Sequence, residues 1–275
     1  MGVSSKWTAD EQGRRRSLGT EAAPGDPNVR HQTGNSQGRA IPRSFPLNPE
    51  LVMVRQPRSV AAERFRRLAT VLANEHGEKV QILVVTSPTP AAGKSVVALN
   101  LALAFAGEPG KTLLVDADLR RPTVESWLIP PPALGLSEIL ARQADLEDGI
   151  LDLADFPLRI LPAGRPVNDP MKLLSSEEFR LFVTKLRGRF PRIIIDTPPI
   201  LTFSDADAIA ALSDGVLLVV KAGATSRVEC LEAISSVTSS RVLGLVLNGS
   251  IRNLVDRHRN YESHYREYYR KDRER

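Results

Sequence analysis

The most constraining feature of this sequence is an apolar run that leads into a Gly-Lys-Ser triplet. Residues 80–86 (VQILVVT) are rich in β-branched side chains, which is typical of a fully buried strand. A loop containing Pro88 and Pro90 follows, and the residues from Lys94 to about Ala106 have the pattern of an apolar helix. A strand, a loop and a helix in this order can gather backbone N–H groups around one point, which is the local structure of a phosphate-binding loop.

Further apolar runs alternate with helical segments along the chain. They predict strands at residues 112–115, 158–161, 192–195, 215–220 and 241–247. This alternation predicts an α/β fold of the P-loop NTPase type, with a mostly parallel central sheet and helices on both faces. Ligands of such sheets bind at the carboxyl ends of the strands, so functional side chains are expected there.

Composition divides the chain into three parts. Residues 1–48 contain 4 Pro and 6 Gly among polar residues without apolar periodicity, which predicts a disordered or flexible segment. Residues 49–250 form the predicted ATPase domain, which starts with an amphipathic helix at residues 60–74. Residues 251–275 form a tyrosine-rich C-terminal tail, also predicted to lack fixed structure.

The formal net charge of +5 originates in the two ends of the chain. Residues 49–248 carry 22 Lys and Arg against 23 Asp and Glu, so the predicted domain is nearly neutral and nucleic-acid binding is not expected. The basic ends either contact an acidic partner or an anionic membrane surface, or simply remain solvated. The sequence contains neither a membrane-spanning run nor the apolar stretch of a secretory signal. With Cys230 as its one cysteine, it fits a cytoplasmic protein.

The loop from Ser87 to Ser95 (SPTPAAGKS) has the parts that phosphate binding needs. Lys94 is predicted to reach the β- and γ-phosphates, and Ser95 to ligate Mg²⁺. The loop prolines have no N–H, so the cradle is expected from the residues nearest the helix. These residues are Ala91, Ala92, Gly93, Lys94, Ser95 and Val96. A positive φ angle at Ala91 would strain this cradle by about 1 kcal/mol. An ordinary helix start with the same triplet is the alternative.

Two further strand ends carry carboxylates. Asp116 and Asp118 begin the motif Asp-x-Asp-x-Arg-Arg-Pro, and Asp196 follows the strand at residues 192–195. Carboxylates at the edge of an apolar strand are costly unless a cation or hydrogen-bond donors compensate them, and Mg²⁺ beside substrate phosphates is such a cation. One of them could also accept the proton of an attacking hydroxyl. Each motif alone also fits a solvated turn or a helix cap.

Together these motifs resemble the Walker A, A′ and B motifs of the bacterial tyrosine kinases, or BY-kinases, of polysaccharide synthesis and export. The resemblance covers roughly residues 50–269 and includes five more segments. These segments are Gly135–Glu138, Leu161–Gly164, Asn168–Pro170, Ser204–Asp207 and Gly244–Asn248. The resemblance implies that Lys94, Asp116, Asp118 and Asp196 are catalytic, and that Ser95 and the three aspartates bind or orient Mg²⁺. It also implies that Arg120 contacts ATP and that Asn248 contacts the adenine of ATP.

All 4 tyrosines of the chain lie near its end, in the segment YESHYREYY. They are Tyr261, Tyr265, Tyr268 and Tyr269. Members of the family end in such a cluster, so the resemblance implies an ATP-dependent tyrosine autokinase that modifies this cluster and regulates exopolysaccharide or capsule synthesis and export. The other interpretation is an aromatic stripe packed on a helix. No aliphatic residue follows Val255, and this composition favours an accessible tail.

The resemblance also implies partners. These are a separate transmembrane activator that recruits the chain to the inner face of the plasma membrane, a cognate tyrosine phosphatase, and further copies of the chain that are phosphorylated in trans. Relatives carry Glu-x-x-Arg-x-x-Arg in the first helix for ring assembly. Glu63 and Arg66 match this pattern, but Ala69 stands at its last position, so a ring is not implied.

Two other functions fit part of the sequence. A ParA/MinD-type ATPase has a similar loop, but such proteins carry a signature lysine four residues before the P-loop glycine, where this chain has Thr89. Their membrane-binding members also end in an apolar amphipathic helix, unlike this tail. A nucleotide-sensing scaffold would bind ATP without transferring phosphate, and its tyrosine tail would only dock on an export protein.

Overall fold

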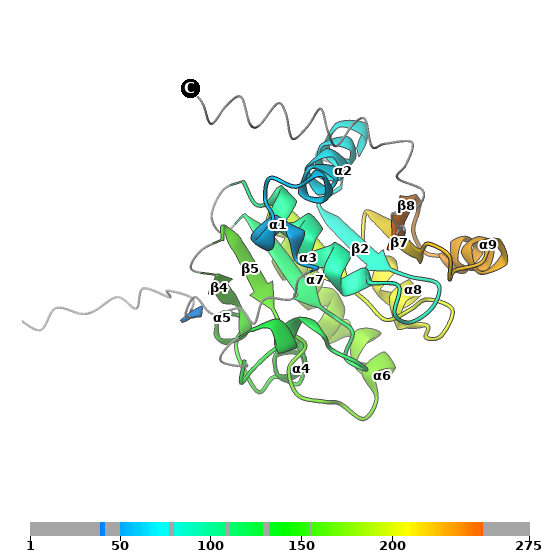
Figure 1. Ribbon diagram of the computed structural model, residues 1–275. Helices are drawn as coiled ribbons and strands as arrows, with labels where there is room; N and C mark the ends of the chain where they lie inside the picture. Colours follow the sequence, from blue (N-terminus) through cyan, green and yellow to red (C-terminus); the bar gives the residue numbers. More distant parts are fainter. Residues whose placement is uncertain are drawn as a thin grey trace, which may run out of the picture. The chain divides into compact units, whose positions relative to one another are not determined.

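The computed structural model describes residues 39–41, 50–76, 80–107, 111–128, 132–153 and 156–249 (Figure 1). The four tyrosines and most of the N-terminal segment therefore lie outside the described residues. No helix among the described residues is long and apolar enough to cross a membrane.

The described residues form an eight-stranded sheet at the centre of the fold. The strands are β1 (Arg39–Ile41), β2 (Ile82–Thr86), β3 (Thr112–Asp116), β4 (Leu151–Leu153), β5 (Leu158–Leu161), β6 (Arg192–Asp196), β7 (Gly215–Lys221) and β8 (Val242–Asn248). Their order in the sheet is β1-β4-β5-β3-β6-β2-β7-β8. Neighbouring strands are parallel except for β4 and β5, which confirms the predicted mostly parallel sheet.

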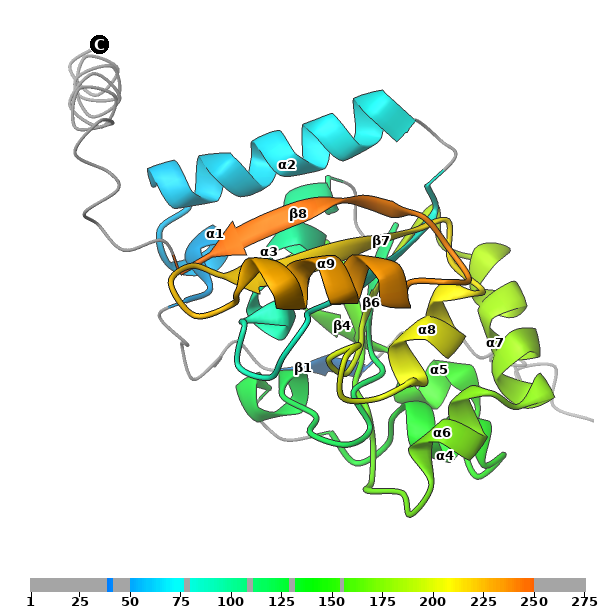
Figure 2. The same cartoon turned by 90° about the vertical axis from the view of Figure 1, so that its right-hand side faces the viewer.

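Helices cover both faces of this sheet (Figure 2). They are α1 (Val52–Arg55), α2 (Val60–His76), α3 (Lys94–Phe105), α4 (Leu136–Leu140), α5 (Leu146–Gly149), α6 (Pro170–Leu174), α7 (Glu177–Arg187), α8 (Asp205–Ala210) and α9 (Arg227–Ser236), with a 3₁₀ turn at Val124–Trp127. Residues of α2 and α3 belong to the core on one face, and residues of α4, α7 and α8 to the core on the other.

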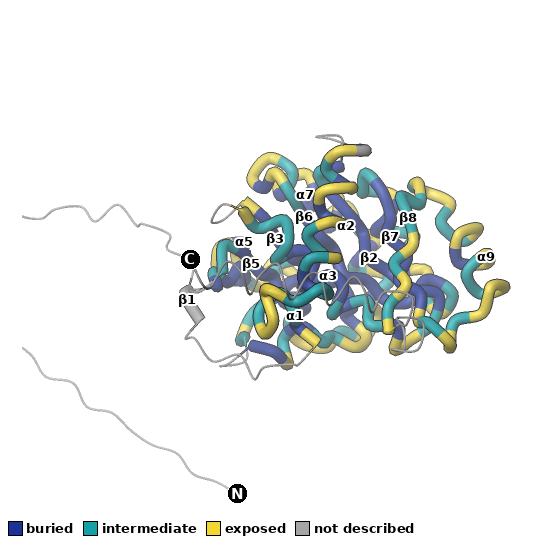
Figure 3. The backbone as a smooth tube through the Cα atoms, turned by 45° about the horizontal axis from the view of Figure 1, so that its top comes forward, coloured by how far each residue is buried: buried dark blue, intermediate teal, exposed yellow. Residues whose placement is uncertain are grey.

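Strand β2 shows why the central strands read as continuous apolar runs. Ile82 and Val84 lie in one core and Leu83 and Val85 in the other, and all four are buried. Successive side chains of a strand point to opposite faces, so a strand covered on both faces needs apolar residues at every position. Figure 3 shows these buried strands at the centre, whereas α9 is mostly exposed.

The strands predicted from the sequence are present to within two residues of their expected bounds, but β1 and β4 were not predicted. Both are three residues long, too short for a period-two pattern to be recognised. Strand β1 lies inside the segment that the sequence predicts to be flexible, and it pairs with β4. The domain boundaries at residues 48 and 250 remain a prediction.

Helix α2 carries the partial ring-assembly motif. The Arg66 Nη1 atom lies 3.1 Å from the Glu63 Oε2 atom, so these two matching residues pair with each other within the helix. Ala69 is buried in the core between α2 and the domain. The third position of the motif therefore packs inward here and presents no side chain to a neighbouring molecule.

Candidate active site

The loop between β2 and α3 has an unusual backbone. Ala91 has a φ angle of 61° and Gly93 one of 84°. A positive φ directly after Pro90 is what the third position of a type II turn requires, where glycine is usual. Ala91 thus adopts the strained conformation considered from the sequence, at a cost of about 1 kcal/mol. Gly93 has a second constraint, since a Cβ atom there would lie 2.2 Å from the Asn248 Nδ2 atom.

This loop ends at the N-terminus of the 12-residue helix α3. Within the described part of the chain, no group accepts a hydrogen bond from the backbone N–H groups of Gly93, Lys94, Ser95 or Val96. Free N–H groups at a helix N-terminus bind anions, and the helix dipole adds to the attraction. The geometry matches the phosphate cradle expected from the sequence, although phosphate binding by these residues remains a prediction.

Lys94 connects the loop to the Asp-x-Asp motif. Its Nζ atom lies 2.7 Å from the Asp118 Oδ2 atom, and both side chains are largely buried. Burial lowers the pKa of Lys94, but the carboxylates of Asp196, Asp118 and Asp116 outweigh this effect and raise it above its ordinary value. Lys94 is therefore the cation that balances a cluster of three acidic side chains.

Asp116 and Asp196 lie side by side on neighbouring strands. They are register partners at the ends of β3 and β6, and neither is exposed to solvent. The Asp116 carboxylate accepts hydrogen bonds from the backbone N–H groups of Asp118, Thr123 and Val124, at 3.1–3.2 Å. Asp116 thus fixes the loop that carries Asp118. The structure shows this role in addition to the catalytic and magnesium roles implied by resemblance.

Asp196 has a different environment. No well-formed hydrogen bond reaches either of its carboxylate oxygens among the described residues, although the Ser95 side chain and the Thr197 backbone lie close enough to favour its ionised form. Burial raises its pKa to about 6, and the Lys94 charge limits the rise. Burial and the Asp196 charge also raise the pKa of Asp116 well above its ordinary range. The pair therefore retains a proton at pH values where exposed carboxyl groups are ionised.

The unpartnered oxygens of Asp196 fit a magnesium ion or its water. Among the described residues, no three acidic, histidine or cysteine side chains converge closely enough to hold a metal by themselves. Mg²⁺ is usually held by one or two carboxylates together with phosphate oxygens and water, so this is the arrangement expected of a nucleotide-dependent site. Asp196 and the buried Ser95 are the residues best placed to hold it.

We expect MgADP binding to strengthen as the pH rises through about 6. If ionised Asp196 binds the metal as predicted, a proton on Asp196 competes with it, so affinity should fall by up to about tenfold per pH unit below that value. Titration calorimetry between pH 5 and 8 checks this, with Asp196→Asn as the control that loses this pH dependence. Equal affinity of the wild type at pH 5 and 8 would contradict it.

Arg120 is held by a buried carboxylate. Its Nε and Nη2 atoms donate to the two oxygens of Asp205 at 2.5 and 3.2 Å, and its guanidinium lies 4.2 Å from the centre of the Phe203 ring. Asp205 is fully buried at the start of α8. The structure thus ties the Asp-x-Asp loop to α8 through Arg120, and a contact of this arginine with ATP remains a prediction. No role was predicted for Asp205 itself from the sequence.

The last two strands also reach the phosphate-binding loop. The Asn248 Nδ2 atom donates to the carbonyl oxygen of Ala92 at 2.9 Å, and the Lys221 Nζ atom donates to that of Ala91 at 3.2 Å. Asn248 was a candidate from the sequence. Lys221 was missed because it lies outside any motif, although its place at the carboxyl end of a predicted strand was an available signal.

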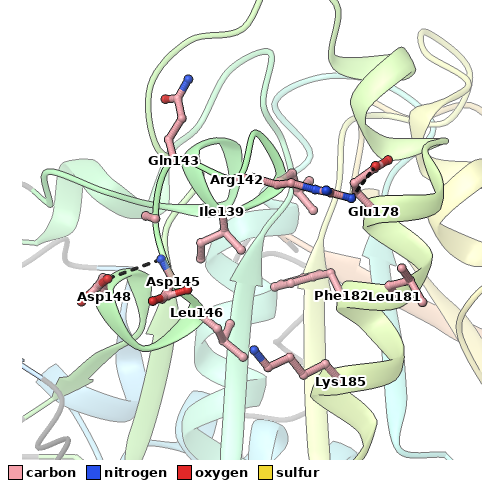
Figure 4. A pocket seen from close by; sticks show the side chains of 12 residues that line it. Ile139, Arg142, Gln143, Asp145, Leu146, Asp148, Glu178, Leu181, Phe182 and Lys185 are labelled. Atoms are coloured by element: carbon pink, nitrogen blue, oxygen red, sulfur yellow. Dashed lines mark hydrogen bonds and ion pairs between the residues drawn. The ribbon is translucent and has the colours of Figure 1, made fainter.

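A cavity of about 550 Å³ lies elsewhere, between α4, α5 and α7 (Figure 4). Its lining mixes apolar side chains such as Phe182 with charged ones such as Lys185, and Arg142 pairs with Glu178 at its rim. None of the predicted site residues lines it. The cavity is therefore separate from the site at the strand ends.

The fold and the site together define a P-loop nucleotide-binding protein. A phosphate-binding loop joins β2 to α3, and carboxylates stand at the ends of two adjacent parallel strands, β3 and β6. In chain order these strands are separated by more than seventy residues, and the sheet brings them together.

Comparison with known proteins gives the family. No family model matches the sequence. The tyrosine-protein kinase YwqD of Bacillus subtilis is 30% identical over 210 residues, which span 75% of this chain and 89% of YwqD. The succinoglycan biosynthesis transport protein ExoP of Rhizobium meliloti is 31% identical over 218 residues, 77% of this chain and 28% of ExoP. The solved kinase domain of the Escherichia coli tyrosine kinase ETK superposes with a TM-score of 0.71 at 29% identity, covering 76% of this chain and 84% of that one. The chain therefore belongs to the bacterial tyrosine kinase (BY-kinase) family.

Proposed function

We propose that this protein is an ATP-dependent tyrosine autokinase that phosphorylates its own C-terminal cluster, Tyr261, Tyr265, Tyr268 and Tyr269. The observation that carries the proposal is the position of Asn248. This residue ends β8, contacts the phosphate-binding loop, and precedes Tyr261 by thirteen residues. A chain of that length can span up to about 45 Å, enough to reach the site of its own or another molecule.

The chemistry follows from the charges of the site. MgATP supplies the γ-phosphoryl group. The tyrosine oxygen forms a bond to the γ-phosphorus as the bond to the ADP oxygen breaks, and a carboxylate accepts the tyrosine proton. We propose that Asp118 accepts this proton, because Asp116 already accepts three backbone hydrogen bonds whereas Asp118 accepts one, from Arg121. Lys94 exchanges its contact with Asp118 for the phosphates, so the arrival of nucleotide releases the base.

We also propose that the kinase serves polysaccharide synthesis or export at the membrane. The support is the similarity to ExoP, a succinoglycan biosynthesis transport protein of which this chain matches only 28%. A separate transmembrane activator would recruit this chain to the inner face of the plasma membrane, other copies of the chain would be phosphorylated in trans, and a cognate phosphatase would reverse the modification. The buried Ala69 argues against assembly through the family's ring motif.

The test is a phosphotyrosine assay on the full chain with MgATP, with and without a candidate activator in vesicles. We expect signal in the wild type and none in the variant with all four tyrosines replaced by phenylalanine. The four-tyrosine variant has an intact site but no acceptor, whereas Lys94→Met keeps its tyrosines but has an impaired site. A mixture of the two therefore distinguishes transfer within one molecule from transfer between molecules. Signal in the mixture means transfer in trans, and its absence beside an active wild type means transfer in cis.

Other outcomes would identify the competing functions. Binding and hydrolysis of ATP without phosphotyrosine, even with the activator present, would contradict the kinase proposal and favour a ParA/MinD-type ATPase. Binding without either hydrolysis or phosphotyrosine would favour a nucleotide-sensing scaffold.

A further inference from the structure

Two successive carbonyl groups of the phosphate-binding loop accept hydrogen bonds from side chains of the last two strands. Lys221, at the end of β7, donates to the Ala91 carbonyl, and Asn248, at the end of β8, donates to the Ala92 carbonyl. The two strands are neighbours, and Lys221 and Asn248 are register partners. One edge of the sheet thus presents two donors side by side to the loop.

These hydrogen bonds fix the orientation of two peptide groups. In a planar trans peptide the C=O and the following N–H point in opposite directions. The bond from Asn248 to the Ala92 carbonyl therefore turns the N–H of Gly93 away from Asn248. The bond from Lys221 likewise turns the N–H of Ala92 away from Lys221. The Gly93 N–H has no acceptor among the described residues, so it is free to donate a hydrogen bond to an anion.

The loop needs such support because of Ala91. Its φ angle of 61° lies in a region that side chains other than glycine rarely adopt. Without an external contact this residue would relax toward negative φ, and the peptide group that follows it would rotate. Gly93, at 84°, has no such preference. The hydrogen bond from Lys221 therefore restrains the loop at its most strained residue, Ala91.

We propose that Lys221 and Asn248 are positioning residues that hold the Ala91 and Ala92 carbonyls, and thereby hold the phosphate-binding N–H groups in place. We call this pair the carbonyl clamp. The inference rests on the proposed binding of nucleotide, but it does not require phosphotransfer. It also gives Asn248 a role that is independent of any contact with adenine.

The first test measures MgADP affinity by titration calorimetry. Lys221→Met is expected to weaken binding about fivefold to tenfold, because an exposed charge-assisted hydrogen bond is lost. Lys221→Arg keeps a donor and is expected to bind within about twofold of the wild type. The matched control is Lys185→Met, an exposed lysine on α7 outside the site, which should leave the affinity unchanged.

The second test asks whether Lys221 acts through Ala91. Ala91→Gly removes the preference for negative φ. In the Ala91→Gly protein, Lys221→Met should therefore lower the MgADP affinity by less than about twofold. A merely structural role of Lys221 would lower the melting temperature of the free protein equally in both backgrounds. An unchanged affinity in Lys221→Met, or a loss that Ala91→Gly does not reduce, would overturn the clamp.

The third test separates Asn248 from adenine recognition by using magnesium pyrophosphate, which has no base. If Asn248 acts through the loop, Asn248→Ala should weaken the binding of pyrophosphate and the binding of ADP by the same factor. A loss confined to ADP would show an adenine contact and refute the clamp for Asn248. A wild type that binds neither ligand would refute the clamp together with nucleotide binding, whereas binding without phosphotyrosine leaves the clamp intact and removes only the kinase proposal.

Discussion

Replacement of Lys94 by methionine is expected to reduce tyrosine phosphorylation at least about a thousandfold and to destabilise the free protein by about 3 kcal/mol at pH 8. The loss of activity follows from the proposed role of Lys94, which is to neutralise charge on the transferred phosphoryl group. The loss of stability follows because Lys94 is the partner of the buried Asp118 and lies near Asp116 and Asp196. Without it, three carboxyl groups share a site that has no balancing charge.

Phosphotyrosine yield and urea denaturation of the free protein measure the two effects. The matched control is the double variant Lys94→Met/Asp118→Asn, which should recover most of the stability and none of the activity. The destabilisation should also be smaller at pH 5, where the raised pKa values of Asp196 and Asp116 leave these groups protonated. A Lys94→Met protein as stable as the wild type at pH 8 would contradict this account of the charge cluster.

Asp196→Asn is expected to separate activity from stability. Activity should fall at least about a hundredfold, because the carboxylate predicted to hold or orient the magnesium ion is lost. The free protein should nevertheless become more stable at pH 8, by up to about 3 kcal/mol. Asp196 in the wild type is buried and ionised at that pH, and the Lys94 charge and the contacts from Ser95 and Thr197 do not fully offset the cost of burial, which asparagine removes.

The sign of the pH dependence follows from the raised pKa. A group that binds its proton more tightly in the folded state stabilises the fold at low pH, and this contribution is lost as the pH rises through its folded pKa of about 6. The difference between Asp196→Asn and the wild type should therefore grow from about pH 4 to pH 6 and then level off. Urea unfolding at pH 4, 5, 6 and 8 measures it. A variant less stable than the wild type at pH 8 would contradict this account, because it would show that the Lys94 charge and the other contacts of Asp196 outweigh the cost of its burial.

The sequence predicted those parts of the site that depend on local pattern. The apolar run before Gly93 and the carboxylates after two other strands each lie in a short window that strand periodicity and residue type identify. Even the strain at Ala91 was anticipated, because glycine was missing where positive φ was needed. The class of fold followed from the alternation of such windows.

The long-range contacts of the site could not be predicted, because they depend on which strands become neighbours in the sheet. Lys221 contacts a loop 130 positions away, and Arg120 contacts Asp205 across 85 positions. No window of sequence contains both members of either pair, so only the order of strands in the sheet reveals them. The accessibility of the tyrosine cluster stays a prediction, because it lies outside the described residues.

The strand order also governs when the site is complete during synthesis. Strand β8 is the last of the described strands to be made, and it supplies Asn248 to a loop residue, Ala92, that was made 156 residues earlier. A nascent chain still lacking β8 holds Lys94 and all three aspartates but has only part of the support for its phosphate-binding loop. An unfinished chain that lacks β8 is therefore expected to bind nucleotide less tightly than one that contains it.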